Sequence, residues 1–118
     1  MSPKHAKEEI ILAADKVVSG KMSGLAGIRR IYARLVYIHF SDKPEAEGIK
    51  ALVNLAENLP TETDLICANE RERSNANKQI SQFEKTYNKM ICKQCMIVSE
   101  WIKKSLMWGN NLDYPQIR

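Results

Sequence analysis

The fold is decided by the stretch ISQFEKTYNKMICKQCMIVSEWIKKSL, residues 80–106. Apolar side chains recur in it every three or four residues, which is the spacing of one face of an α-helix. The apolar stripe consists of Ile80, Phe83, Tyr87, Met90, Ile91, Cys95, Val98, Trp101, Ile102 and Leu106. A helix of about 30 residues is about 45 Å long, roughly three times the mean length of helices in globular proteins. We therefore predict a helical protein built around one long C-terminal helix, residues 78–106.

The residues before this stretch predict four shorter helices. Ser2 and Pro3 form a capped helix start, because the serine hydroxyl accepts a backbone hydrogen bond and proline fits the first turn. A second helix is expected at residues 25–40 and a third from about residue 44. Thr61 and Asp64 form an approximate capping box that starts the fourth. The sequence thus predicts an all-α, single-domain bundle of about five helices, covering residues 1–118.

The polar run at residues 69–77 interrupts the pattern. It holds three asparagines and one serine, and these side chains compete with the helical backbone for hydrogen bonds. We therefore expect a break or kink near Ser74, between the fourth helix and the long one. The long helix is expected to end at Gly109, because glycine commonly follows the last helical turn.

The composition is that of an ordinary globular protein. Charged residues make up 27% and hydrophobic residues 44% of the 118 residues, which are usual values. The net charge of +4 is evenly divided, because residues 1–60 and residues 61–118 each hold nine basic and seven acidic side chains. The N-terminus lacks the apolar core of a signal peptide, and no apolar run could span a bilayer. We expect a cytoplasmic protein without membrane contact.

Three cysteines and two histidines are the candidates for metal or nucleophilic chemistry. Cys92 and Cys95 form a C-x-x-C pair, but a structural zinc ion needs four ligands, and redox pairs lie where a helix begins. Inside a long helix, we interpret these cysteines as small apolar packing residues, with a metal or thiol enzyme as the least favoured reading. His39 is interpreted as a hydrogen-bonded core histidine of the second helix rather than a ligand or base. We expect no enzymatic activity, no cofactor and no metal site.

Two outward faces of the predicted helices are candidate partner-binding surfaces. On the second helix, Arg30, Arg34 and Tyr37 follow the spacing i, i+4, i+7, and arginine and tyrosine are enriched in interface hot spots. The alternative interpretation is that these are three ordinary solvated side chains.

The second candidate face lies on the long helix, opposite its apolar stripe. Lys89, Lys93 and Met96 lie on it, in a row that also contains Lys78 and Lys85. Methionine is an adaptable contact residue and lysine guides association electrostatically, although a lysine row is often only a solvated face. Nucleic acid could also use these lysines, but no aromatic residue is interleaved to stack on bases.

Four segments carry a resemblance to a known family. They are GKMS at residues 20–23, LPTETD at residues 59–64, FEKTY at residues 83–87 and the late Cys95. In this order the chain resembles an uncharacterised family of short bacterial helical proteins, a domain of unknown function. The resemblance implies an α-helical fold and supplies no active site. In general format the chain also resembles the immunity proteins of contact-dependent growth inhibition systems, which are small, helical and cytosolic.

These observations lead to one leading functional hypothesis and one alternative. We expect a non-catalytic protein-binding protein, an immunity protein that neutralises a bacterial toxin domain by steric blocking. Its partner-binding residues would come from Arg30, Arg34, Tyr37, Lys89, Lys93 and Met96. The alternative is a small nucleic-acid-binding regulator that uses the lysine row, although the modest, evenly divided charge does not favour it. The sequence leaves the oligomeric state open.

Overall fold

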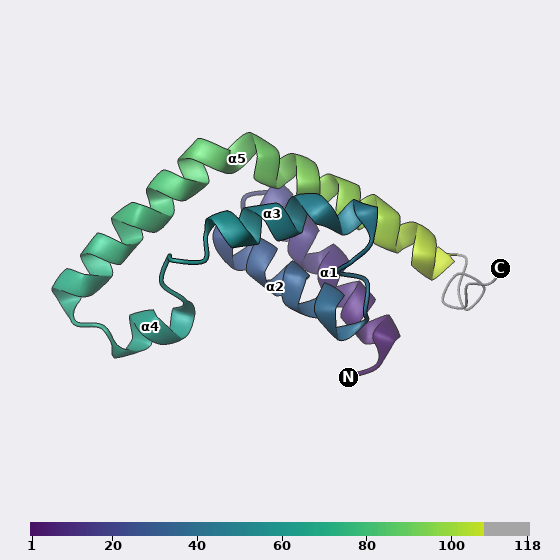
Figure 1. The fold of residues 1–118 in the computed structure, drawn as a ribbon, viewed down its shortest axis with the longest axis horizontal. Coiled ribbons are helices and arrows are strands. Elements are labelled where there is room, and N and C mark those ends of the chain that lie inside the picture. The colour runs from purple at the N-terminus through teal and green to yellow at the C-terminus, as the bar shows by residue number, and fades with distance from the viewer. Residues whose placement is uncertain (108–118) are drawn as a thin grey trace.

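The computed structural model describes residues 1–107 and shows an all-α fold (Figure 1). Within these residues it contains five α-helices, one short 3₁₀ turn and no strand. They are α1 (Pro3–Val18), α2 (Gly24–Tyr37), the turn η1 (Pro44–Ala46), α3 (Glu47–Leu55), α4 (Glu62–Cys67) and α5 (Glu70–Met107). This confirms the predicted fold class, a helical bundle with one long C-terminal helix.

The first helix begins as the sequence predicts. The Ser2 hydroxyl accepts a hydrogen bond of 3.0 Å from the backbone N–H of His5, and Pro3 occupies the first turn. After α1, Gly20 adopts φ +78°, a left-handed conformation that glycine tolerates best. Gly27 lets α2 approach α1 closely, because a Cβ at this position would lie 2.1 Å from Cγ2 of Val17.

The end of α2 differs from the prediction, and His39 is not a core residue. The helix stops at Tyr37, and His39 is exposed with φ +64°. The N–H of Phe40 bonds to the carbonyl of Leu35 at 2.8 Å, and the N–H of His39 bonds to that of Val36 at 3.1 Å. This pair of bonds is a Schellman motif, with histidine at the position that glycine usually takes. The helical wheel misplaced His39 because the helix ends before reaching it.

The long helix starts earlier than predicted, and there is no break at Ser74. Asn69 Oδ1 accepts a 2.8 Å hydrogen bond from the N–H of Glu72, and Glu72 Oε1 accepts one of 2.9 Å from the N–H of Asn69. This reciprocal pair has the form of a capping box. An asparagine taken as a helix breaker therefore starts the helix, and α5 runs through the polar run for 38 residues. The capping box of Thr61 and Asp64 at the start of α4 is confirmed.

Figure 1 shows two regions of different character along α5. Its C-terminal half lies along α1, α2 and α3, and α1 packs most extensively against α5 and α2. Its N-terminal part extends beyond these helices, with α4 beneath it. We call residues 62–82, which comprise α4 and the first turns of α5, the arm. The longest dimension of the molecule is 53 Å.

The core lies where the first three helices meet the C-terminal half of α5. Its largest fully buried side chains are Ile10, Ile28, Ile31, Leu35, Ile49, Leu52, Ile91, Cys95, Val98 and Ile102. The predicted stripe of α5 is confirmed except at Met90, which is exposed. Trp101 packs half-buried against the core and stacks on Phe40, with ring centroids 5.4 Å apart.

Two further expectations concern the end of the long helix and membrane-spanning segments. The predicted helix end at Gly109 lies outside residues 1–107. Over residues 1–107, no helix has both the length and the apolar character that a membrane span requires.

Candidate functional site

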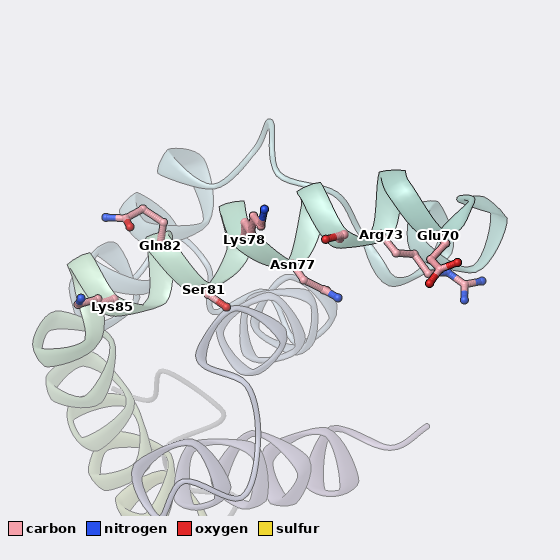
Figure 2. A pocket seen from close by; sticks show the side chains of 8 residues that line it. Glu70, Arg73, Asn77, Lys78, Ser81, Gln82 and Lys85 are labelled. Atoms are coloured by element: carbon pink, nitrogen blue, oxygen red, sulfur yellow. The ribbon is translucent and has the colours of Figure 1, made fainter.

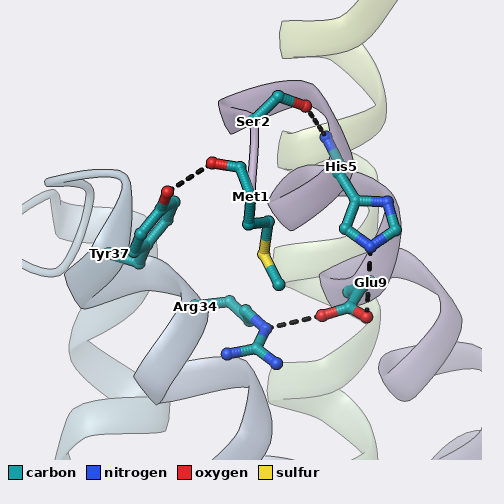
Figure 3. Close-up of polar contacts among 6 residues, drawn as sticks. All are labelled: Met1, Ser2, His5, Glu9, Arg34 and Tyr37. Atoms are coloured by element: carbon teal, nitrogen blue, oxygen red, sulfur yellow. Dashed lines mark hydrogen bonds and ion pairs between the residues drawn. The ribbon is translucent and has the colours of Figure 1, made fainter.

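Two of the three predicted residues on α2, Arg34 and Tyr37, make hydrogen bonds within the protein (Figure 3). Arg34 Nε donates a 2.6 Å hydrogen bond to Oε1 of Glu9 on α1, and the Tyr37 hydroxyl donates to the carbonyl of Met1. His5 Nε2 lies 3.5 Å from the same Glu9 carboxylate. Arg34 and Tyr37 therefore tie α2 to the start of α1. The expected outward position holds for Tyr37, which is exposed, whereas Arg34 is half-buried. Arg30 is exposed.

The charges around Glu9 favour its ionised form. The hydrogen bond from Arg34 is the main cause that lowers the pKa of Glu9, and partial desolvation opposes it. The positive charges of Arg34, His5 and Arg30 also act to lower this pKa. An opposite charge close by stabilises a carboxylate, so Glu9 keeps its charge, and its tie to Arg34, to a lower pH than an isolated glutamate would.

A groove of about 690 Å³ lies between α2 and the arm. We call it the α2–arm groove; its lining comes from α2, from residues 60–65 and from residues 77–84 of α5. Sequence reasoning missed it, because its walls come from three separate segments of the chain and only the course of the arm brings them together. Of the predicted site residues, Arg30 and Arg34 line it.

Two hydrogen-bonded side chains fix the shape of this groove. Arg29 donates three hydrogen bonds of 2.8–2.9 Å to the carbonyls of Ala56, Leu59 and Pro60, which hold the segment before α4 against α2. The Glu84 carboxylate accepts hydrogen bonds from the N–H of Leu25, at 2.9 Å, and from the Ser23 hydroxyl. A carboxylate at a helix N-terminus is favoured by the helix dipole. Glu84 thus joins α5 to the start of α2 just after the arm ends.

The predicted face of α5 is exposed in full. Lys89, Lys93 and Met96 are all on the surface, with Met96 58% exposed. Beside Met96, Ile97 is 38% exposed and Trp101 is half-buried. These last three residues line a shallow pocket of about 430 Å³ together with Glu45, Glu100 and Lys104. We call Lys89, Lys93, Met96, Ile97 and Trp101 the α5 face. The sequence identified three of its members, and the other two were assigned to the buried stripe or not singled out.

A second shallow hollow lies on the arm (Figure 2). All of its lining residues come from α5: Glu70, Arg73, Ser74, Asn77, Lys78, Ser81, Gln82 and Lys85. Figure 2 shows these side chains spread along the helix rather than converging on one point. Arg73 also donates to the carbonyls of Leu65 and Ile66, at 2.9 and 3.3 Å, and so satisfies the end of α4. The hollow combines mixed charges with no nucleophile paired to a base.

The cysteines are arranged for packing. Cys95 is buried, and its burial, with a smaller contribution from Cys92, raises the pKa of the Cys95 thiol to about 12. At neutral pH it is therefore a thiol rather than a reactive thiolate. Cys92 is half-buried and Cys67 lies exposed at the end of α4. In residues 1–107, no three or more His, Cys, Asp or Glu side chains gather in a way that could hold a metal ion.

A buried polar contact between α1 and α5 was not expected from the sequence. Lys7 is buried, and its ammonium donates a 2.8 Å hydrogen bond to the Ser105 hydroxyl. The same ammonium lies 5.1 Å from the centroid of the Phe40 ring, within the range of a cation–π interaction. The signal was present, because Lys7 is seven residues before the buried Ala14 and therefore borders the apolar stripe of α1. The contact joins the beginning of α1 to the end of α5 and lines no pocket described above.

Comparison of the chain with protein-family models, with curated proteins and with solved structures found no match.

Proposed function

We propose that this chain is a non-catalytic protein-binding protein and that the α5 face is its main contact surface. The finer proposal is that its partner is a bacterial toxin domain, which it neutralises by covering it sterically. The resemblance in format to immunity proteins supports the choice of partner, and the exposed side chains of α5 support the choice of surface.

The observation that carries the proposal is the composition of the α5 face on a rigid helix. Met96 and Ile97 are exposed next to the half-buried ring of Trp101. A large aromatic side chain anchored at its base and surrounded by adaptable apolar groups is typical of interface hot spots. Lys89 and Lys93 flank this apolar group, so the partner surface is expected to carry acidic side chains that guide association.

The test is a titration of the full chain against the product of the adjacent gene. Combining Lys93→Glu with Met96→Ala should weaken the complex by about 2 kcal/mol or more if the face contains a hot spot. Lys50→Glu combined with Leu55→Ala is the matched control, because it changes an exposed lysine and an exposed apolar residue on α3. Circular dichroism checks folding in each variant.

Three outcomes are informative. Loss of affinity in the α5 variant alone supports the proposal. Loss of affinity in an Arg30→Ala variant instead would place the contact on α2. The absence of any partner among the products of neighbouring genes would rule out the toxin interpretation.

One observation favours nucleic-acid binding as a second candidate function. Lys78, Lys85, Lys89 and Lys93 are all exposed along α5. Phosphate-driven binding to duplex DNA weakens by about 0.9 log units per log unit of salt for each phosphate neutralised. With a net charge of +4, we expect weak or no binding at physiological salt. Submicromolar binding there, lost in Lys85→Glu with Lys89→Glu, would replace the leading proposal.

A further inference from the structure

The α2–arm groove is a second candidate binding site, distinct from the α5 face. Its volume of about 690 Å³ falls in the usual range for sites that bury a ligand of peptide or drug size. The groove lies at the other end of α5 from Trp101, between α2 and the arm. Its occupant can be inferred from the chemistry of its walls.

The wall formed by α2 is cationic. Arg29, Arg30 and Arg34 all line the groove. The three hydrogen-bond acceptors of Arg29 are neutral carbonyl oxygens, and the charged group that acts on this guanidinium is the carboxylate of Asp64 on α4. Arg30 is exposed at the surface, whereas the charge of Arg34 is balanced by Glu9. Arg30 is therefore the arginine of this wall whose charge is best placed to attract an anion.

The carboxylates in the groove do not cancel this charge evenly. Glu84 is engaged by the N-terminus of α2, through Leu25 and Ser23. Glu62 lies on the arm side, in the first turn of α4. On the same side, Asp64 acts on Arg29. The positive charge that remains available on the α2 wall is therefore that of the exposed Arg30.

The remaining lining is apolar or neutral. Leu25 is buried, and Leu65 and Ile80 are half-buried, so they offer an apolar floor for one side chain. Asn77 and Ser81 on α5 supply amide and hydroxyl groups that can bond to a peptide backbone. A cationic wall, an apolar floor and a neutral polar wall together match an acidic segment that carries an apolar side chain.

We propose that the α2–arm groove binds an acidic peptide segment of another protein. In this arrangement one apolar side chain packs against Ile80 and Leu65, and one carboxylate pairs with Arg30. Nucleic acid fits the same positive charge less well, because none of the groove's lining residues within residues 1–107 is aromatic, and single strands are commonly held by stacking on aromatic rings.

The experiment is a selection from a random dodecapeptide display library with the full chain at physiological salt. We expect the selected peptides to be enriched in Asp and Glu together with one large apolar residue. The affinity of one selected peptide, measured by fluorescence anisotropy, should fall about tenfold or more in Arg30→Glu. Ala33→Trp, which fills the groove from an exposed position on α2, should weaken binding similarly without disturbing the core.

Arg71→Glu is the matched control, because Arg71 is an exposed arginine of the arm that does not line the groove. It should leave the affinity of the peptide within about twofold of the wild type, because rim charges far from a contact contribute little. The proposal is overturned if no peptide is selected, if the selected peptides lack acidic residues, or if Arg71→Glu weakens binding as much as Arg30→Glu. It is also overturned if Lys93→Glu abolishes binding, which would place the peptide on the α5 face, or if a single-stranded oligonucleotide binds more tightly and depends on Arg30.

Discussion

The two ends of α5 belong to one continuous helix but lie in very different surroundings. Toward its C-terminus Ile91, Val98 and Ile102 are fully buried against the first three helices. In the arm only Ala76 is buried, and Ile66 on α4 is 74% exposed. The C-terminal half of α5 is therefore held by the core, whereas the arm is held by hydrogen bonds at its ends and by Ile80, which packs half-buried against the core.

This difference shows that a helix can form for one reason and be stable for another. The arm is helical because Asn69 and Glu72 cap its long helix and Arg73 satisfies the end of α4. Most helical stability in proteins, however, comes from tertiary packing of an apolar face. A region with few buried apolar contacts opens locally at a lower free energy than the whole protein unfolds. We therefore expect the arm, which forms one wall of the α2–arm groove, to open locally before the core unfolds.

The largest expected effect compares one isoleucine from each region. Ile102→Ala in the core should lower the free energy of unfolding by about 2–5 kcal/mol, since it removes buried methyl groups and leaves a cavity. Ile66→Ala in the arm should change it by less than about 0.5 kcal/mol, as exposed substitutions usually do. Urea denaturation followed by circular dichroism measures both values. Equal losses would mean that the arm is packed as firmly as the core.

The second prediction concerns Glu84, which joins the two regions. Glu84→Gln keeps the size of the side chain but removes the charge that the N-terminus of α2 favours. We therefore expect the free energy of unfolding to fall by about 1 kcal/mol. Hydrogen exchange in the arm should also become faster. Glu100→Gln, at an exposed position on α5, is the control and should alter neither. Unchanged exchange in the Glu84 variant would show that this carboxylate does not hold the arm.

The third prediction sharpens the description of the bundle at the end of α2. His39→Gly should raise the free energy of unfolding by about 0.5 kcal/mol, because relief of the left-handed strain outweighs the extra chain entropy of glycine. Thermal unfolding gives the sign. A destabilised variant would indicate that the contacts of the histidine side chain stabilise the protein by more than its backbone strain costs.

The smallest expected effect is the pH dependence of the contact between α1 and α2. The pKa of Glu9 lies below its ordinary value of 4.5, chiefly because Arg34 donates a hydrogen bond to it. A carboxyl whose pKa is lower in the folded state stabilises the protein above its unfolded pKa and loses that contribution as the pH falls through the folded value. NMR titration should show the lowered pKa in the wild type and a value closer to 4.5 in Arg34→Ala. An identical pKa in both proteins would contradict the assignment of its cause.

The fold could be predicted from the sequence where apolar side chains recur at helical spacing. It could be predicted less well where a single residue decides the beginning or end of a helix. The periodic stripe of α5 and the caps at Ser2 and Thr61 were sufficient for the architecture. The prediction of a break at Ser74 was wrong. Asparagine disfavours the interior of a helix, but Asn69 caps this helix and so starts it. The position of His39 was wrong because a Schellman motif ends α2 two residues before it.

The candidate sites were predicted only in part. A helical wheel showed that Lys93 and Met96 face away from the stripe, and both are exposed. It could not show that Arg34 meets Glu9, because that contact depends on the packing of α1 against α2. The α2–arm groove depends on the course of the whole chain between Ser23 and Glu84, which no local pattern encodes.

Residue-resolved hydrogen exchange along α5 tests the contrast between its two ends most directly. Amides of residues 88–107 should exchange only through global unfolding, whereas amides of residues 74–82 should exchange faster, through local opening of the arm. The boundary between the two classes should fall near Glu84. Uniform protection along the whole helix would contradict the division into a packed half and an arm.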